Sequence, residues 1–240
     1  MKLKYALAFA AALVSLALAP SGNGSIVYLQ PTLWTGTGTD VGNSLTSHSE
    51  NPPNTGFRTL DDFSLGSAAT IDEVIWWGIY IHTDLTNASP NTTDWSIRFQ
   101  ADNAGVPGAI LASETLPAAQ VTRQLVGTGT FGQGNTVDVY QFTAPFPNFS
   151  AAAGITYWFS ALSRGPTFDP LFSWIEGTNG NGTSFQTHFV NGVNVSGTLL
   201  EGADRAFALA QLPEPSTLLL IGAGLAALLS RRRLPMRARA

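Results

Sequence analysis

The sequence predicts an all-β protein: an antiparallel β-sandwich of jelly-roll-like topology, flanked by an N-terminal signal helix and a short C-terminal transmembrane helix. Two observations predict the sheets. Short apolar or alternating runs recur along residues 55–212, and clusters of Gly, Asn and Pro separate them. A third observation, an uncharged apolar run near each end of the chain, predicts the flanking helices.

The first 21 residues have the features of a secretory signal peptide. Met1-Lys-Leu-Lys4 is basic, and residues 5–19 form an apolar run without charge. The small residues of Ala19-Pro-Ser21 favour cleavage between Ser21 and Gly22. Residues 22–54 are polar and rich in Gly, Thr and Asn, so we interpret them as a lead-in that could contribute the first strands of the body.

Residues 55–212 are expected to form the sandwich domain. In residues 95–101, apolar side chains alternate with polar ones, which predicts a half-buried antiparallel strand. Residues 70–81 are apolar on both faces, which predicts a central strand covered on both sides. Further strands are predicted at residues 57–65, 137–143, 155–162, 171–175, 184–190 and 205–212.

Turn-forming residues separate these segments. Turns are predicted at residues 102–105, 165–166, 179–182 and 191–192, which are rich in Gly, Asn and Pro. Residues 109–120 suggest a helical turn, which Pro117 interrupts.

The body is strongly acidic. Residues 22–213 contain five arginines, no lysine and 15 carboxylates, a net charge of −10. Such a surface repels a phosphate backbone, so we do not expect nucleic-acid binding. The chain has no cysteine, which excludes disulfides and thiolate metal sites.

The C-terminal segment, residues 213–240, has three parts in a fixed order. Pro213-Glu214-Pro215 precedes an apolar run at residues 216–230, and the basic cluster Arg231-Arg232-Arg233 follows. Residues 215–230 would form a helix of about 24 Å, shorter than the ~30 Å hydrocarbon core of a bilayer. Basic residues beside an apolar run stay in the cytoplasm, so the arginines here and the lysines at the N-terminus both place the body outside. The short run predicts a temporary anchor, with Pro-Glu-Pro extended and accessible at its outer end.

This three-part segment resembles the PEP-CTERM sorting signal of exported proteins in Gram-negative bacteria. The resemblance implies that an exosortase, a membrane-embedded protease or transpeptidase, recognises and cleaves the segment. The membrane association is then transient, and the mature protein reaches the cell envelope, the outer surface or the medium. Asp61-Asp-Phe63, together with residues 71–78 and 97–108, also resembles a β-sandwich of many exported PEP-CTERM proteins, for which no chemistry is assigned.

The motifs of common cofactor enzymes are weak in this chain, and no cofactor is predicted. Gly127-Thr-Gly-Thr-Phe-Gly132 has the spacing of a dinucleotide fingerprint, but a strand-like segment follows it instead of a helix, so we interpret it as a turn. His48, His82 and His188 lack the close spacing typical of a zinc site. The sequence contains no Gly-x-Ser-x-Gly elbow for a nucleophilic serine.

Carboxylates offer two further hypotheses. Hydrolysis by acid–base chemistry needs two carboxylates that face one cleft, and the candidates are Asp61, Asp62, Asp72, Glu73, Glu114 and Glu176. Solvated surface charge is the more ordinary explanation of these residues. Asp102-Asn103 with Asp84 or Asp94 could supply oxygen ligands to Ca²⁺, although an Asx turn explains the same residues.

Aromatic residues are the remaining indication of a ligand. An exposed indole can stack on a sugar ring, and the candidates are Trp77, Trp158 and Trp174, although core packing explains most tryptophans. The sequence therefore predicts a non-enzymatic exported protein that associates with the cell envelope or its exopolysaccharide. Two alternatives stay open: a secreted carbohydrate-binding module and a secreted hydrolase with a carboxylate pair.

Overall fold

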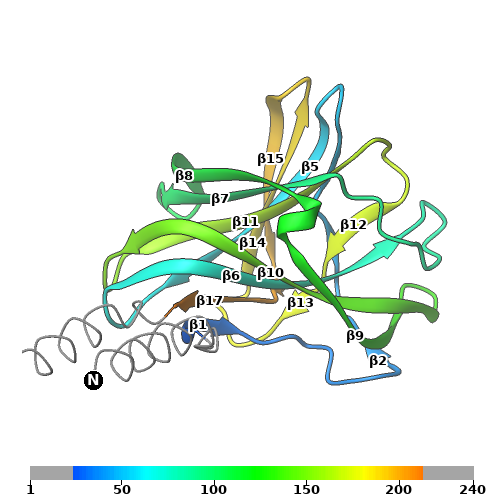
Figure 1. Ribbon diagram of the computed structural model, residues 1–240, viewed down its shortest axis with the longest axis horizontal. Coiled ribbons are helices and arrows are strands. Elements are labelled where there is room, and N and C mark those ends of the chain that lie inside the picture. Colours follow the sequence, from blue (N-terminus) through cyan, green and yellow to red (C-terminus); the bar gives the residue numbers. More distant parts are fainter. Residues whose placement is uncertain (1–23, 213–240) are drawn as a thin grey trace, which may run out of the picture. The chain divides into compact units, whose positions relative to one another are not determined.

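The structure is a computed structural model that describes residues 24–212. Residues 26–211 form one compact unit, in which the only helical element is the short 3₁₀ turn η1 (Ala118–Gln120). Figure 1 shows that strands make up the rest of its regular structure. The all-β prediction is therefore confirmed. The predicted signal peptide (residues 1–21) and the predicted C-terminal helix (residues 216–230) lie outside the described residues.

The first large sheet has eight strands, in which β6 is the central member. Its main path is β1-β17-β6-β10-β9-β2, and β12 joins β6 while also pairing with β3. The strands are β1 (Ser25–Gln30), β2 (Thr39–Asp40), β3 (Leu45–Thr46), β6 (Ala69–Ile81), β9 (Thr122–Phe131), β10 (Asn135–Ala151), β12 (Leu171–Trp174) and β17 (Phe207–Gln211).

The second large sheet has seven strands in the order β15-β14-β5-β4-β11-β7-β8. These are β4 (His48–Glu50), β5 (Thr55–Ser64), β7 (Asp94–Asp102), β8 (Pro107–Pro117), β11 (Thr156–Gly165), β14 (Thr183–Val190) and β15 (Val193–Glu201). A separate small pair joins β13 (Glu176–Gly177) to β16 (Asp204–Arg205). Residues 25–50, most of the polar lead-in, thus supply β1 to β4.

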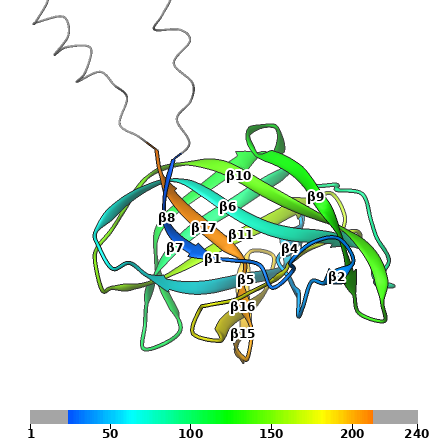
Figure 2. The same cartoon turned by 90° about the horizontal axis from the view of Figure 1, so that it is seen from below.

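An aromatic core joins the two large sheets. The ring of Trp76 on β6 lies 4.9 Å from that of Trp95 on β7, and Phe142 on β10 lies 4.9 Å from Trp95. Phe99 on β7 stacks on Phe149 of β10 at 4.3 Å. Figure 2 shows β6 and β10 in one layer and β7 and β11 in the other. Burial of these large rings is the main source of stability between the layers.

Strand β6 is covered on both faces, as its sequence predicts. It pairs with β10, β12 and β17. Trp76 and Tyr80 belong to the shared aromatic core, whereas Ile79 belongs to a second apolar cluster with Val41 and Val137. Gly78 permits the close approach of β12, because a Cβ at this position would lie 2.1 Å from the Phe172 ring.

The prediction for residues 95–101 is correct on one face and wrong on the other. Trp95, Ile97 and Phe99 are buried in the shared core, as expected. Ser96 and Gln100 are also buried, with exposed fractions of 5% and 8%. The outer face of β7 is therefore covered, because the sheet to which it belongs curls over that face.

A fork between β5 and β11 accompanies this curl. The two strands pair directly over Asp61–Ser64 and Thr156–Phe159. Beyond this point they separate, and the short β4 fills the gap by pairing antiparallel with β5 and parallel with β11. In Figure 1, β14 and β15 consequently run across the direction of β7 and β8.

Two local predictions are wrong. Residues 107–117 form strand β8 paired with β7 rather than a helical turn, and only η1 is helical there. Residues 127–131 lie in strand β9 and pair with β10, so the turn begins only at Gly132. In both places, pairing with a neighbouring strand outweighs the weak local preference of the sequence for a helical or a tight turn.

Candidate functional site

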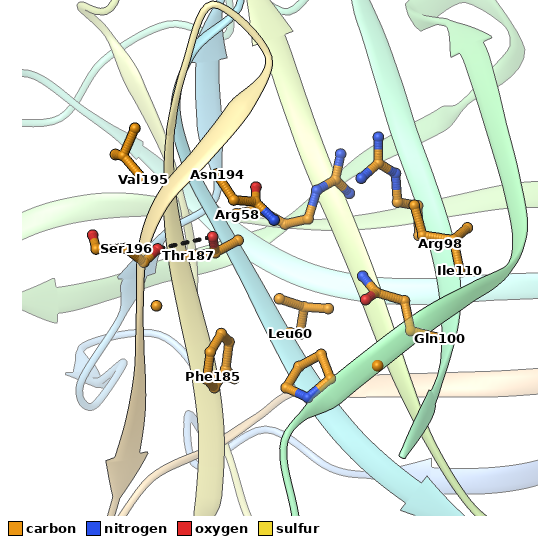
Figure 3. A pocket seen from close by; sticks show the side chains of 13 residues that line it. Arg58, Leu60, Arg98, Gln100, Ile110, Phe185, Thr187, Asn194, Val195 and Ser196 are labelled. Carbon is orange, nitrogen blue, oxygen red and sulfur yellow. Dashed lines mark hydrogen bonds between the residues drawn. The ribbon is translucent and has the colours of Figure 1, made fainter. Parts of the chain in front are cut away.

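A pocket lies where the two edges of the seven-stranded sheet approach each other. Its floor comes from β5, β7 and β14, and its walls come from the edge strands β8 and β15. Its volume is about 460 Å³, which is within the ~300–1,000 Å³ typical of small-molecule sites. The lining residues, most of them labelled in Figure 3, are Arg58, Leu60, Arg98, Gln100, Pro107, Gly108, Ile110, Phe185, Thr187, Asn194, Val195, Ser196 and Gly197.

The alternation of the strands places these side chains on the outer face of the sheet. Phe99 points into the aromatic core, so its neighbours Arg98 and Gln100 point to the opposite side. On β5, Arg58 and Leu60 line the pocket in the same way, while Phe63 belongs to the core. The polar positions that the sequence assigns to solvent therefore form the pocket floor.

The wall formed by β15 lies close to β14. Gly197 permits this approach, because a Cβ there would lie 2.5 Å from Cζ of Phe185. The hydroxyl of Thr187 donates a hydrogen bond of 3.0 Å to the carbonyl oxygen of Ser196, which holds the two strands together beside the pocket (Figure 3). Asn191 and Gly192 form the turn between them with φ of 51° and 78°, as a tight hairpin requires.

Arg58 is an almost fully buried cation without a carboxylate partner. Its exposed fraction is 4%, because its side chain extends across the fork towards β11 and β7. Nη1 donates to the hydroxyl of Ser160 at 2.8 Å and to the carbonyl oxygen of Ser96 at 3.1 Å. Nη2 donates to the hydroxyl of Ser96 at 2.9 Å. All of these acceptors are neutral.

Arg98 lies beside Arg58 in the same pocket. Within residues 24–212 its guanidinium has no hydrogen-bonding or ion-pairing partner, and its Nε atom is buried. Burial lowers the pKa of Arg58 well below its usual value, and the charges of Arg98 and Arg164 lower it further. Burial also lowers the pKa of Arg98, with a smaller contribution from Arg164. Arg164 itself pairs with Asp94 at 3.3 Å, so the positive charge in the pocket belongs to the other two arginines.

The predicted sugar-stacking residues do not form a platform. Trp158 and Trp174 have exposed fractions of 1% and 0%, so the prediction is wrong at both positions. The indole N–H of Trp158 donates to Asp102 at 2.9 Å, and that of Trp174 donates to the carbonyl oxygen of Ala206 at 2.7 Å. Both rings are packed inside the domain. Trp77 is half-buried against the second apolar cluster and lies outside the pocket lining.

The predicted carboxylate candidates do not meet in the pocket. Asp61 and Asp62 are consecutive residues of β5 and therefore point to opposite faces. Asp62 accepts a hydrogen bond of 2.9 Å from Asn181, and Glu176 accepts one of 2.6 Å from the backbone N–H of Asn43. Asp72 and Glu73 lie on β6, and Glu114 lies on the edge strand β8. None of the six lines the pocket.

Asp61 belongs to a buried polar cluster on the inner face of β5. Its Oδ2 accepts hydrogen bonds from the amide of Gln30 at 2.6 Å and from the backbone N–H of Arg205. Its Oδ1 accepts from the backbone N–H of Asp62 at 2.8 Å. Burial raises the pKa of Asp61 well above its usual value, although the hydrogen bond from Arg205 opposes this shift.

The same cluster holds the fully buried Arg205. Its Nη1 donates to the carbonyl oxygens of Asn43 and Trp174. Burial lowers the pKa of Arg205 to about 10, while Asp61, Glu176 and Asp204 act in the opposite direction. Carboxylates therefore surround this arginine, in contrast to the pair in the pocket.

The three histidines have separate partners, although His48 and His188 both pair with Phe57 from the strands on either side of it. His48 is buried, with its ring nitrogens near Ser163 and the carbonyl oxygen of Thr167, and His82 pairs with Asp169 at 2.9 Å. His188 stacks on Phe57 at 4.7 Å. Across residues 24–212, no three His, Asp or Glu side chains are grouped so that they could hold a metal ion.

The predicted Ca²⁺ ligands have protein partners. Asp102 accepts hydrogen bonds from the backbone N–H of Gly105 at 3.2 Å, which is the Asx-type turn considered for this segment. Asp84 accepts from the backbone N–H of Thr86 at 3.0 Å, and Asp94 pairs with Arg164. These contacts explain all three carboxylates as parts of turns or ion pairs.

The arginine pocket is the feature that sequence analysis missed. A signal for it exists, since Arg58 and Arg98 are two of only five basic residues in an acidic body, and Arg98 lies on the polar side of a strand. Their proximity depends on the pairing of β5 and β7 with β11. Pairing between strands so distant in sequence cannot be obtained from the alternation within each one.

The fold and the pocket define a compact all-β domain with a cationic pocket. Comparison with known families adds the delivery route: residues 211–233 match the PEP-CTERM protein-sorting motif. The chain is thus an exported protein that carries the signal of an exosortase substrate, as its sequence predicts. No curated protein and no solved structure matches the chain.

The residues that carry the sorting prediction lie outside the described part of the chain. These are Pro213, Glu214, Pro215, Arg231, Arg232 and Arg233, together with Ser21 and Gly22 at the predicted signal-peptide cleavage site. Within residues 24–212, the structure contains no helix with the length and apolar character needed to cross a membrane.

Proposed function

We propose that this protein is a non-enzymatic binding protein of the cell envelope or its exopolysaccharide, released from a transient membrane anchor by an exosortase. The sorting motif at residues 211–233 carries this proposal. It supports delivery to the outer side of the membrane, and the short apolar run at residues 216–230 favours a temporary transmembrane helix over a permanent one. The body would be a jelly-roll-like β-sandwich, as its two core-sharing sheets suggest.

The pocket supports binding rather than hydrolysis. Its lining contains arginines, amides, hydroxyls and apolar groups, and it includes neither a carboxylate nor a histidine. A retaining or inverting glycosidase needs two carboxylates about 5–10 Å apart on either side of the scissile bond. A carbohydrate-binding module is therefore the favoured alternative, with the pocket rather than exposed tryptophans as the binding site.

Processing can be tested at the C-terminus. In a host that has an exosortase, mass spectrometry of the wild-type protein should find a mature form without residues 216–240. Replacing Pro213, Glu214 and Pro215 together by alanine should leave a slightly larger species in the membrane fraction. An intact C-terminal peptide on wild-type protein that stays in the membrane would contradict the proposal.

The outer location can be tested with a reporter fused within the body. Basic residues flank both apolar ends of the chain, so a periplasmic or external reporter is expected. Protease added to spheroplasts should degrade the body. A protected, cytoplasmic body would exclude an envelope function.

A further inference from the structure

Two arginines in one pocket carry charge that the protein does not neutralise. Arg58 is bonded only to neutral oxygens, and Arg98 has no partner among residues 24–212. Burying an unpaired charge costs free energy unless an opposite charge or several hydrogen bonds offset it. The cost is unusual in a body that contains 15 carboxylates and could have supplied a partner. A bound anion would remove it.

The arrangement of the two groups suits a planar anion. Figure 3 shows the guanidinium groups of Arg58 and Arg98 side by side, each extending towards the other from its own strand. A guanidinium binds a carboxylate through parallel N–H···O hydrogen bonds, and the planar shapes of the two groups match. Two adjacent guanidinium groups can therefore share the two oxygens of a single carboxylate.

The rest of the lining suits a sugar ring attached to that carboxylate. Gln100 and Asn194 offer amide groups for the sugar hydroxyls. Leu60, Ile110 and Phe185 offer apolar surface for the C–H faces of the ring. The volume of about 460 Å³ falls in the range of small-molecule pockets, ~300–1,000 Å³.

We propose that this pocket binds uronate residues of an acidic polysaccharide, with the sugar carboxylate held between Arg58 and Arg98. The choice of a polysaccharide rests on the proposed envelope function, whereas the choice of an anion rests on the arginines alone. The net negative charge of the body opposes the approach of a polyanion at long range. At 0.15 M ionic strength this repulsion is screened beyond about 8 Å, and the contact in the pocket remains.

Calorimetric titration of the full chain in a mild non-ionic detergent tests the proposal. The probe is tetragalacturonate at 0.15 M salt, and the matched neutral probe is its methyl ester, which keeps the sugar rings and removes the charge. Monomeric galacturonate, inorganic phosphate and sulfate separate sugar recognition from simple anion binding. We expect the acid to bind, the ester to bind at least about 10-fold more weakly, and both inorganic ions to bind more weakly than galacturonate.

Matched variants test whether the ligand binds in this pocket. Arg98→Gln removes a guanidinium that makes no hydrogen bond within the described residues, so the fold should remain, and binding should weaken at least about 10-fold. Arg123→Gln is the control: it makes the same charge change on the exposed part of β9, outside the pocket. Asn194→Asp adds a carboxylate to the pocket wall and should also weaken binding. Thermal unfolding of each variant checks that it is folded.

Three results would overturn the proposal: equal binding of the acid and its ester, equal binding by Arg98→Gln and Arg123→Gln, or no binding of tetragalacturonate. Phosphate or sulfate binding as tightly as galacturonate would overturn sugar recognition. Cell fractionation distinguishes failure of the pocket proposal from failure of the proposed envelope function. If wild type and Arg98→Gln both remain with the exopolysaccharide, the pocket proposal fails and the envelope function stands. If exported wild type reaches neither envelope nor exopolysaccharide, the proposed function fails whatever the titration shows.

Discussion

The two faces of the seven-stranded sheet handle buried polar groups in opposite ways. On the inner face, the carboxylate of Asp61 accepts three hydrogen bonds from the protein, and the buried Arg205 lies among carboxylates. On the outer face, only three residues away on β5, Arg58 is surrounded by other arginines and neutral oxygens.

This difference separates a structural polar cluster from the proposed binding site. The Asp61 cluster joins β1, β5 and the small strand β16 through side chains and backbone, so its partners are all internal. Both places contain buried guanidinium nitrogens without a hydrogen-bond partner, namely Nε of Arg98 in the pocket and Nε and Nη2 of Arg205 in the cluster. The pocket differs because carboxylates act on the charge of Arg205 but not on those of Arg58 and Arg98, and because the pocket has an unfilled volume. The cationic pocket without neighbouring carboxylates is therefore where we propose a ligand.

The largest expected change in the free energy of unfolding is on the core side of β7, and the matching change on its pocket side should be small. Phe99→Ala should lower the free energy of unfolding by about 3–5 kcal/mol, because the ring is fully buried against Phe146, Phe149 and Phe159. Gln100→Ala, one residue along and facing the pocket, should cost less than about 1 kcal/mol. Urea unfolding measures both. Similar costs at the two positions would show that the faces do not differ as described.

Removal of the inner carboxylate should have the next largest effect. Asp61→Ala should cost about 2–3 kcal/mol, since the amide of Gln30 and the backbone N–H of Arg205 both lose their acceptor in a buried place. Urea unfolding of this variant, with the exposed Glu201→Ala on β15 as a control, gives the value. A cost no greater than that of the control would mean that the cluster does not stabilise the fold.

The pH dependence of stability offers a third test. Burial raises the pKa of Asp61 in the folded state, so the folded protein holds this proton at pH values where the unfolded chain has released it. Stability from this group is therefore greatest below the unfolded pKa of about 3.9 and falls as the pH rises towards the folded value, by at most about 1.4 kcal/mol per pH unit. Asp61→Asn should flatten the slope above pH 4 in urea unfolding. An unchanged slope would assign the dependence to other groups.

The smallest expected effect is on the outer face. Arg58→Met should change the free energy of unfolding by less than about 1 kcal/mol, because loss of three hydrogen bonds to neutral groups is offset by removal of a buried unpaired charge. The same variant should lose binding of tetragalacturonate. A cost comparable to that of Asp61→Ala would indicate that Arg58 is a structural residue and that the two faces are alike.

Much of the strand pattern could be predicted because each strand carries its own signal. The alternation at residues 95–101 identified β7 and its core side, and the apolar run at residues 70–81 identified β6 as central. The exposed edge strands were harder. Strands β8 and β15 have mostly exposed side chains. Because they lack a fully buried face, their sequences do not need an apolar residue at every second position. Residues 127–131 are rich in Gly and Thr and become a strand only by pairing with β10.

The candidate site could not be predicted for a related reason. The alternation placed Arg98 on the polar side of its strand, but it could not show that the outer face would be covered. The covering depends on the fork between β5 and β11 and on the β14–β15 hairpin, which are properties of the whole sheet. The tryptophans were misleading because size and aromatic character favour burial more strongly than sugar contact. The sorting signal was recognisable because its three parts are contiguous.

The pocket walls have a consequence for how its specificity can change during evolution. Both walls are edge strands, and the side chains of Ile110 and Val195 are largely exposed to solvent. Substitutions there would alter the opening of the pocket while leaving the aromatic core untouched. The arginine pair is fixed by the inner strands, whereas the rim is free to vary. If the pocket binds uronates as proposed, descendants of this chain could keep the arginine pair that anchors the carboxylate and diversify in the glycans that they accept.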